Sequence, residues 1–527
     1  MFVKHIEQTF DEDPKRAQSE PVTSERIVVV GAGVGGITAA AILARRGFDV
    51  HLLEKEARVG GKVRAEQIAG VSIDVGPTVL TMRWTLERAF EAAGAHLSDY
   101  VTLEALPRIA RHRFRDGSEL DLFPNVDANV AAIRAFAGPR EADGYRAFAA
   151  YGARLFELVN ARFLSAQRPS LAELLGLAGH FGPSALLRID AHRTMAASVE
   201  RFFQDPRLRQ LFNRYATYVG SSPYSTPATL HVIAHVEHSG VWSVEGGMAA
   251  LASGLERLAV DRGVTIRRAT SVVELVVRSG RARGVVLADG STIDAAAVVF
   301  AGDSAALARG LLGAPARRAV KTGARRSLSA LTIAAHGTLE GVELDRHNVF
   351  FSGDYRAEHD ALSAGRLPAD PTLYVCAADR GSASPPEGAE RLFFIMNAPA
   401  TGELGSDRWS TAMAEDELTR GLSRSGIRLR ATAPMCVATP ATLAERYPGS
   451  NGAIYGEATE SMSASLKRPG AKTSIERLIL AGGTVHPGAG VPMAMQSGCL
   501  AAEEVEAQLR STSSRARVAM PGGTSMR

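Results

Sequence analysis

A run of closely spaced glycines near the N-terminus has the residue types and spacing of a phosphate-binding turn. Gly31, Gly33 and Gly36 form the pattern G-x-G-x-x-G directly after the β-branched run Arg26–Val30. In such a turn the first glycine permits a tight bend, the second lets a pyrophosphate approach the backbone, and the third lets the next helix pack on the strand. Free N–H groups at the start of that helix favour negative charge. We therefore expect a dinucleotide to contact Gly31, Ala32, Gly33, Gly35 and Gly36.

The elements that must position this turn follow it in the expected order. Ile37–Arg46 is a helical stretch that ends at Gly47, and Phe48–Leu53 is a second strand. This strand runs into Glu54, about 20 residues beyond the glycines, where a carboxylate accepts hydrogen bonds from an adenosine ribose. The order strand, turn, helix, strand and acid predicts a Rossmann-type α/β unit. Both NAD and FAD are bound by units of this kind.

Two further turns distinguish between these cofactors. A second glycine pair flanked by cations follows Glu54, and a tight turn follows Asp74. At this spacing from the first motif, they resemble the FAD-binding half of the flavin amine oxidase superfamily. The resemblance implies that FAD is the cofactor and that it is also contacted by Lys55, Gly60, Gly61, Lys62, Gly76, Pro77 and Thr78.

A loop near the C-terminus, Gly482–Gly498, is rich in glycine and follows the strand-like run Arg477–Ala481. The resemblance places this loop against the flavin ring, and Pro492 suits the first turn of a helix expected over 491–509. The positive end of that helix would stabilise charge on the reduced ring. His486 is expected to shape the turn. The predicted flavin contacts are Gly482, Gly483, Gly490, Val491 and Met493.

The rest of the chain divides into segments by composition. Three β-rich runs at 272–277, 282–287 and 292–300 form a predicted meander, separated by the turn signals Ser279-Gly280 and Asp289-Gly290. In the family this meander leads back to the FAD domain, and Val272 would lie at the adenine. We expect a discontinuous FAD domain, a helical and membrane-facing insert, a mixed substrate-domain sheet, and disordered tails. The FAD domain is predicted at 25–105, 228–305 and 445–510, and the helical insert at 106–227. The substrate-domain sheet is predicted at 306–444, and the tails at 1–24 and 511–527.

Charge and cysteine content narrow the function classes. Lys and Arg number 60 and Asp and Glu 56, so the formal net charge is +4. This small excess gives no support for nucleic-acid binding. Cys376, Cys436 and Cys499 lie far apart without a metal-ligand spacing, which predicts reduced thiols, no metal site and a cytosolic chain. The N-terminal segment lacks the apolar region of a signal peptide, and no apolar run approaches the length of a membrane span.

Several stretches resemble bacterial carotenoid desaturases in particular. The general matches are Gly76–Thr81, His347–Tyr355 and Thr484–Met493, and those most like the hydroxycarotenoid 3,4-desaturases (methoxyneurosporene dehydrogenases) are Arg214–Gly220, Gly240–Met248 and Met396–Ala400. One departure is Ala301, where the family pattern has Asn before Gly-Asp.

The resemblance implies desaturation at C3–C4 of an acyclic carotenoid hydroxylated at C1. Hydride transfer to flavin N5 and proton loss from the neighbouring carbon would occur in an apolar tunnel, with oxygen or a quinone as the final acceptor. An insoluble substrate implies a protein that lies peripherally on the cytoplasmic membrane, and Leu171–Leu187 is a candidate interfacial segment. A buried core helix has the same composition.

The substrate side offers few candidate side chains. Glu237 is a candidate for accepting a proton or stabilising positive charge, and Trp242 for stacking on a polyene. A solvated helix end and a core tryptophan are the alternative readings. Arg214 and Tyr215 are either an anchor for a C1 hydroxyl or a structural contact.

Four other functions share part of this pattern. These are a phytoene-type desaturase, a redox-neutral carotenoid isomerase, a flavin amine oxidase and a non-catalytic prenyl-binding protein. Retention of the glycines, Glu54 and the C-terminal loop favours a flavin-binding enzyme over the last of these.

Overall fold

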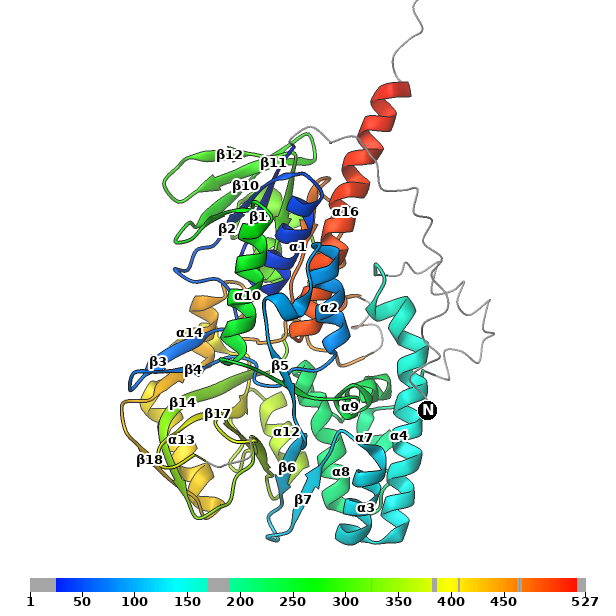
Figure 1. The fold of residues 1–527 in the computed structure, drawn as a ribbon, viewed down its shortest axis with the longest axis vertical. Coiled ribbons are helices and arrows are strands. Elements are labelled where there is room, and N and C mark those ends of the chain that lie inside the picture. The colour runs from blue at the N-terminus through cyan, green and yellow to red at the C-terminus, as the bar shows by residue number, and fades with distance from the viewer. Residues whose placement is uncertain are drawn as a thin grey trace, which may run out of the picture.

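The computed structural model describes residues 25–168, 189–323, 325–381, 386–405, 408–461, 464 and 467–518. These residues form two lobes, drawn one above the other in Figure 1, and chain segments cross between the lobes several times. The upper lobe contains a parallel sheet covered by helices and by a small meander. The lower lobe contains a larger mixed sheet beside a layer of helices. The predicted α/β class, with a Rossmann-type domain and a mixed-sheet domain, is confirmed.

The upper lobe is built on a five-stranded sheet in the order β20-β13-β1-β2-β9, in which all neighbours are parallel. Ile27 and Val29 pack on the helices, whereas Val28 packs on the meander, so β1 is buried on both faces. A continuous β-branched run is typical of such a strand. The strands are β1 (Arg26–Val30), β2 (Asp49–Leu53), β9 (Thr265–Arg267), β13 (Ala297–Phe300) and β20 (Leu478–Leu480).

Four helices that contact one another cover one face of this sheet (Figure 1). The other face is covered by the meander β10-β11-β12. The run predicted as one strand over 292–300 is two strands, because the chain leaves the meander at β12 and enters the parallel sheet at β13. The elements are α1 (Val34–Arg45), α2 (Arg83–Ala92), α10 (Met248–Asp261), α16 (Val491–Val518), β10 (Val272–Arg278), β11 (Arg281–Leu287) and β12 (Thr292–Asp294).

The lower lobe contains an eight-stranded sheet in the order β18-β14-β17-β16-β15-β6-β7, with β19 also paired to β14. One face packs on α13 and the other faces the helical layer. The elements are β6 (Ala110–Arg113), β7 (Glu119–Leu122), β14 (Ser329–Glu340), β15 (His347–Phe350), α12 (Tyr355–Ser363), β16 (Leu373–Ala377), β17 (Glu390–Ala398), α13 (Thr411–Arg424), β18 (Arg428–Ala431), β19 (Cys436–Ala438) and α14 (Pro440–Arg446).

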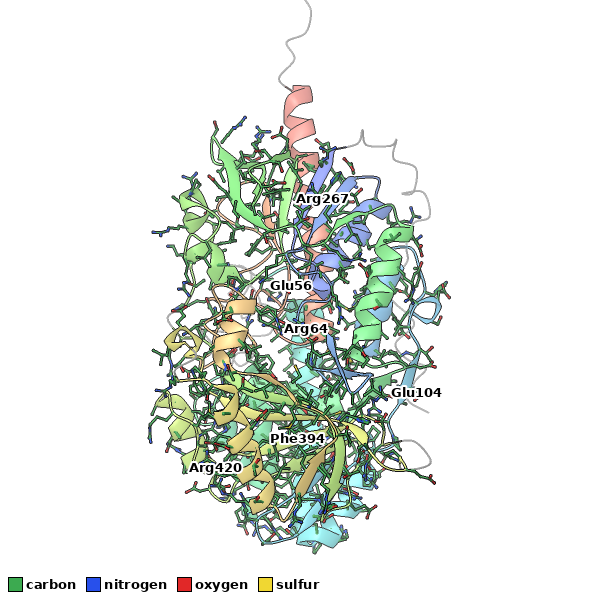
Figure 2. The ribbon with its side chains drawn as sticks, turned by 90° about the vertical axis from the view of Figure 1, so that its left-hand side faces the viewer. Glu56, Arg64, Glu104, Arg267, Phe394 and Arg420 are labelled. Carbon is green, nitrogen blue, oxygen red and sulfur yellow. The ribbon has the colours of Figure 1, made fainter. Side chains whose placement is uncertain are left out.

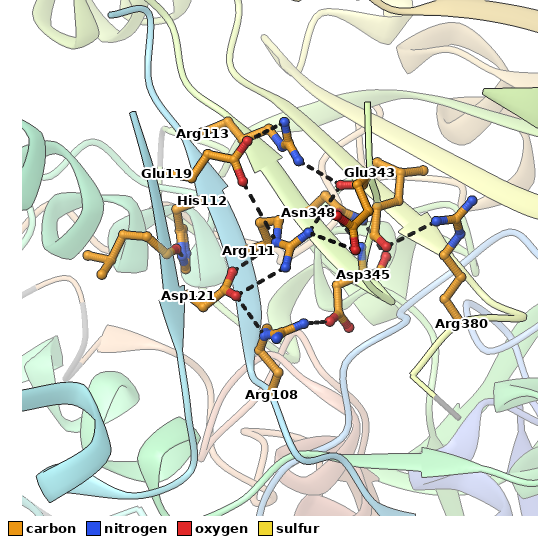
Figure 3. A network of polar contacts seen from close by, with 12 residues as sticks. Arg108, Arg111, His112, Arg113, Glu119, Asp121, Glu343, Asp345, Asn348 and Arg380 are labelled. Atoms are coloured by element: carbon orange, nitrogen blue, oxygen red, sulfur yellow. Dashed lines mark hydrogen bonds and ion pairs between the residues drawn. The ribbon is translucent and has the colours of Figure 1, made fainter. Parts of the chain in front are cut away.

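The prediction of a helical insert over 106–227 is wrong at its start, because β6 and β7 belong to the mixed sheet. β6 pairs in parallel with β15 and antiparallel with β7. Charged residues obscured the strand pattern, but they alternate with buried ones and form the ion-pair network of Figure 3. Arg111 contacts Asp121 at 3.0 Å, and Arg113 donates to the carbonyl of Glu343 at 2.6 Å.

The described remainder of that insert is helical and packs around aromatic side chains such as Tyr145, Phe148 and Phe212. Its described helices are α3 (Val126–Ala137), α4 (Pro139–Val159), η3 (Asn160–Leu164), α7 (Met195–Val199), α8 (Pro206–Asn213) and η4 (Arg214–Val219). The helices η5 (Ala228–His231) and α9 (Val232–His238) contact α4 in the same layer, although the predicted FAD domain resumes at residue 228.

Three predicted segments fall outside the described residues or at their limit. Leu171–Leu187 and the N-terminal tail lie outside them. The C-terminal tail expected from residue 511 begins as helix, because α16 continues to Val518. Among the ranges given above, no helix combines the length and the apolar character needed to cross a membrane.

The remaining short strands connect the lobes. They pair as β3 with β4 and as β5 with β8. Their bounds are β3 (Ala65–Ile68), β4 (Val71–Asp74), β5 (Leu103–Ala105) and β8 (Trp242–Val244).

Candidate active site

A cavity of about 1240 Å³ extends from the glycine turn of the upper lobe to the mixed sheet of the lower lobe. Figure 2 shows Glu56 and Arg64, which both line it, at a level between Arg267 of β9 and Phe394 of β17. Pockets for one small ligand typically measure roughly 300–1,000 Å³. This cavity therefore has room for more than one such ligand.

The end of the cavity in the upper lobe is formed by the turn between β1 and α1. Gly31 has a φ of +100°, which favours glycine. A Cβ on Gly36 would stand 2.1 Å from the carbonyl oxygen of Gly31, whereas a Cβ on Gly33 would have no heavy atom within 4 Å. Gly36 is therefore required for packing, and Gly33 leaves open a place where a ligand can approach the backbone.

The second strand and the second glycine pair complete this end. The Glu54 carboxylate accepts hydrogen bonds from the N–H groups of Ala32 at 2.7 Å and Glu56 at 3.0 Å. The N–H of Gly60 donates to the carbonyl of Ala32 at 2.7 Å, which ties the second glycine turn to the first. Glu54 is thus fixed at the edge of the cavity with its carboxylate beside the turn.

The C-terminal loop meets the same turn from the other side. A Cβ on Gly35 would lie 2.6 Å from the carbonyl oxygen of Ala494, so the starts of α1 and α16 are in close contact. The N–H of Gly482 donates to the hydroxyl of Ser497 at 2.7 Å. Gly490 has a φ of +103° and open space at its Cβ position. The N-termini of two helices therefore face one cavity, which is an arrangement suited to anions.

Two cations, the half-buried Lys62 and the buried Arg468, lie near these helix ends. Lys62 lines the cavity, and its Nζ donates to the carbonyl of Ile454 at 2.6 Å. Burial lowers the pKa of Lys62 to about 8, although the nearby carboxylate of Asp303 opposes the shift. Arg468 donates to the carbonyls of Tyr455 at 3.2 Å and Gly483 at 3.1 Å, and so holds the C-terminal loop in place.

Most of the predicted cofactor residues come together at this cavity. Ala32 and Gly36 do not line it: Ala32 holds Glu54 and Gly60, and Gly36 packs on Gly31. The residues that line it are Gly31, Gly33, Gly35, Glu54, Lys55, Gly60, Gly61, Lys62, Gly76, Pro77, Thr78, Val272, Gly482, Gly483, Gly490, Val491 and Met493.

The part of the cavity in the lower lobe, here called the chamber, is lined by side chains rather than by backbone. Phe393 and Ile395 of β17 line it from the sheet, and Val232, Ile233 and Val236 of α9 line it from the helical layer. These side chains are apolar. The chamber therefore suits a hydrocarbon.

A few polar groups interrupt this apolar lining. Arg214 and Tyr218 reach the chamber from η4, and Tyr374 reaches it from β16. The Tyr374 hydroxyl is within hydrogen-bond distance of His347 Nδ1 at 2.7 Å and of Thr78 Oγ1 at 2.6 Å. Burial lowers the pKa of His347 to about 3, so this histidine is neutral at ordinary pH.

The two predicted catalytic side chains do not line the cavity. Glu237 accepts hydrogen bonds from the hydroxyls of Tyr215 and Tyr218, both at 2.6 Å, so each of its oxygens is occupied. The ring of Trp242 lies over Gly240, where an added Cβ would be 2.5 Å away. Glu237 is thus placed to hold Tyr218 at the chamber wall, and Trp242 is placed to pack in β8.

Comparison with known proteins identifies the group to which this geometry belongs. A family model described as flavin containing amine oxidoreductase matches residues 34–506. The chain belongs to this family. It is an FAD-containing oxidoreductase, and its cradle of glycines, helix N-termini and Glu54 fits a dinucleotide.

Individual relatives extend over almost the whole chain. Hydroxyneurosporene desaturase of Rubrivivax gelatinosus is 44% identical, over 97% of this chain and 98% of its own length. Hydroxyneurosporene desaturase of Cereibacter sphaeroides is 42% identical, over 93% and 99%. A solved putrescine oxidase is similar in fold, with a TM-score of 0.59 and 12% identity over 93% of this chain and 99% of that one. The predicted relationship to the hydroxycarotenoid desaturases is confirmed.

Three side chains of this site have no role assigned from the sequence. Tyr374 lies in β16, which is buried along its whole length and so shows no pattern that marks a functional hydroxyl, and its partner His347 comes from the neighbouring strand β15. Tyr355 closes the stretch His347–Tyr355, which the family resemblance had marked without assigning a role to any residue in it. That resemblance was the available signal for both His347 and Tyr355.

Proposed function

We propose that this protein is an FAD-dependent desaturase that forms the C3–C4 double bond of an acyclic carotenoid hydroxylated at C1. The observation that carries the proposal is the continuity of the cavity, which joins the cofactor cradle to an apolar chamber without an intervening wall. Relatives named hydroxyneurosporene desaturase, at 41–44% identity, support this substrate class.

The residues of the chain bind and orient the two reactants. Bound FAD supplies the two-electron oxidation, by accepting a hydride from the hydrocarbon. Gly33, Glu54 and the N-terminus of α16 would hold the cofactor, and the side chains of β17 and α9 exclude water and align the polyene. Thr78 and Tyr374 connect the FAD-side turn to the sheet through one hydrogen bond.

Membrane contact and electron transfer follow from the same substrate class. A carotenoid partitions into lipid, so we propose that the protein takes it up at the surface of the cytoplasmic membrane as a peripheral protein. Oxygen or a quinone would be the final electron acceptor. Flotation with liposomes and reoxidation rates with each acceptor would test these two points.

The test of the proposed function uses the purified, FAD-loaded protein and liposomes that carry one substrate each. We expect a 1-hydroxylated acyclic carotenoid to give a product two hydrogens lighter, with a red-shifted absorption. A product of unchanged mass would instead indicate an isomerase. Conversion of phytoene alone would indicate a phytoene-type desaturase, and turnover of simple amines would indicate an amine oxidase.

A further inference from the structure

We infer that Arg214 is the specificity-determining residue that binds the terminal oxygen of the substrate, next to the bond that is oxidised. This inference rests on the proposed function and names the group that carries its substrate preference. The hydroxyl of Tyr355 is the second partner of the same oxygen.

The side chain of Arg214 is short of partners for a cation enclosed in protein. Its one hydrogen bond to the described residues is a long contact of 3.5 Å to the Tyr218 hydroxyl, and none of the described carboxylates forms an ion pair with it. Its guanidinium instead lies over the rings of Tyr218, at 5.3 Å, and Tyr374, at 6.0 Å. Guanidinium has five N–H donors, so most of them remain for a ligand in the chamber.

The carboxylate of this network, Glu237, already has hydrogen-bond partners on both of its oxygens. Both oxygens of Glu237 accept from tyrosine hydroxyls, so Glu237 compensates the charge of Arg214 through Tyr218 rather than by direct contact. This arrangement balances the positive charge of Arg214 inside the protein and leaves its N–H donors available. A buried polar group without a partner is costly, which makes an oxygen atom of the substrate a favourable ligand.

Arg214 also lies toward the cofactor end of the chamber. Its guanidinium lies over the ring of Tyr374, and the hydroxyl of this tyrosine is 2.6 Å from Thr78 Oγ1 in the turn predicted to contact FAD. Burial raises the pKa of Tyr455 against the charge of Arg214, and Arg468 donates both to the carbonyl of Tyr455 and to that of Gly483 in the C-terminal loop. In the proposed substrate, C1 is two bonds from C3, so the oxygen on C1 must lie close to the reacting bond. An anchor at the far end of the chamber would be unable to reach it.

Tyr355 supplies the hydrogen-bond acceptor that arginine lacks. Arginine only donates hydrogen bonds, so it donates equally well to a hydroxyl oxygen and to a methoxy oxygen. Tyr355 lines the chamber, and its hydroxyl is buried without a hydrogen-bond partner among the described residues, within the influence of the Arg214 charge. A tyrosine hydroxyl accepts the hydrogen of a substrate hydroxyl, and a methoxy group has no such hydrogen. Arg214 thus selects for oxygen, and Tyr355 selects for the hydroxyl form.

The main experiment compares Arg214→Gln with the wild-type protein on a hydroxylated and a non-hydroxylated acyclic carotenoid. We expect kcat/KM for the hydroxylated substrate to fall about 10- to 100-fold, as for loss of a charged hydrogen bond, while that for the hydrocarbon stays within about threefold. Arg214→Lys should recover part of the loss, because lysine keeps the charge but not the planar donor set.

A matched control is Arg207→Gln in α8, seven positions before Arg214. Arg207 also lies over an aromatic ring, Phe136, at 4.2 Å, and pairs with Asp205 at 2.6 Å, but it does not line the cavity. This variant should lower the melting temperature without changing the ratio of the two kcat/KM values. A ratio that shifts as much in Arg207→Gln as in Arg214→Gln would show a structural effect and overturn the inference.

The second variant, Tyr355→Phe, separates the two roles. It should lower kcat/KM about three- to tenfold for the hydroxylated substrate and leave the methoxylated one unchanged. Equal effects on both substrates would refute the role of Tyr355. If the wild type converts neither hydroxylated nor methoxylated carotenoid, the proposed function fails. If it converts them and Arg214→Gln keeps the wild-type ratio, the inference fails alone.

Discussion

The two ends of the cavity are lined by different chemical groups, backbone at one end and side chains at the other. The cofactor end is formed by backbone: glycines, free N–H groups and the starts of α1 and α16. The chamber is formed by side chains from the mixed sheet and from the helical layer. A backbone site depends on a few residues that must be glycine, whereas a side-chain site tolerates many replacements of similar size. Substitutions should therefore act sharply at one end and gradually at the other.

The largest contrast is expected within the glycine turn itself. Gly36→Val would place a Cβ 2.1 Å from the carbonyl oxygen of Gly31, and should cost at least about 3 kcal/mol of unfolding free energy and all bound FAD. Gly33→Val has open space at its Cβ position, so the fold should persist while FAD affinity falls by about 100-fold or more. Thermal unfolding with and without added FAD measures both. Equal loss of stability in the two variants would contradict the division of roles.

The C-terminal loop offers the next largest effect. Gly490→Val introduces a β-branched residue at a φ of +103°, a strain of roughly 1–3 kcal/mol, at a position that lines the cavity. We expect FAD occupancy after purification to fall roughly tenfold or more. Gly263→Val, at a φ of +86° on the surface turn after α10, is the matched control. A fully yellow, active Gly490→Val protein would refute the placement of this loop at the cofactor.

The protonation of Lys62 should make FAD affinity depend on pH. Burial lowers its pKa to about 8 from 10.5, so the ammonium is charged below about pH 8 and neutral above it. FAD affinity should fall by up to about tenfold as the pH rises through 8, because one cation near the anionic cofactor is lost. The cofactor-free protein should change in the opposite direction, since the unfolded chain binds more protons than the folded one between pH 8 and 10.5 and stability rises there.

The control for this prediction is Lys62→Gln, which should flatten both pH profiles. Titration of FAD fluorescence quenching at several pH values measures the first profile. An unaltered pH dependence in Lys62→Gln would assign the effect to another group.

The smallest effect is expected behind the chamber wall, at Glu237, which does not line the cavity. Glu237→Gln keeps one acceptor for a tyrosine hydroxyl, so we expect kcat to change less than about fivefold while the melting temperature falls. A proton-accepting carboxylate would instead contribute about 10²–10⁴-fold. Single-turnover bleaching of the flavin absorption distinguishes the two, and Trp242→Phe, with a similar position outside the cavity, serves as the control. A loss of 100-fold or more would restore Glu237 as a catalytic residue.

The same contrast explains what sequence could predict. At the cofactor end the sequence predicts that Gly33, Glu54 and Gly490 share one site, and all three line the cavity. Such a prediction is possible because phosphate approach and positive φ permit few residue types, so the motifs have fixed spacing. The chamber depends on contacts between residues far apart in the chain, such as Thr78 with Tyr374 and Tyr215 with Glu237. No local pattern encodes such pairs. Glu237 was noticed for its chemistry, but only the fold shows that both of its oxygens are occupied.

The errors in the fold have a related cause. The strands β6 and β7 were missed because their exposed face is densely charged, and those charges are paired across the sheet edge (Figure 3). The split between β12 and β13 was missed because both are short and β-rich. In each case the neighbouring segment in space, rather than the local sequence, determines the structure.

The contact between the starts of α1 and α16 has a consequence for how the protein is made. β1 lies beside β13, and β13 lies beside β20, so the parallel sheet joins strands that begin at residues 26, 297 and 478. A chain still emerging from the ribosome has its glycine turn early, but it lacks the wall that Gly482 and Ala494 provide until those residues have been made. The cofactor cradle therefore closes only after the meander and the mixed sheet have been synthesised, and a chain cut short before β20 would carry the whole N-terminal motif and still remain colourless.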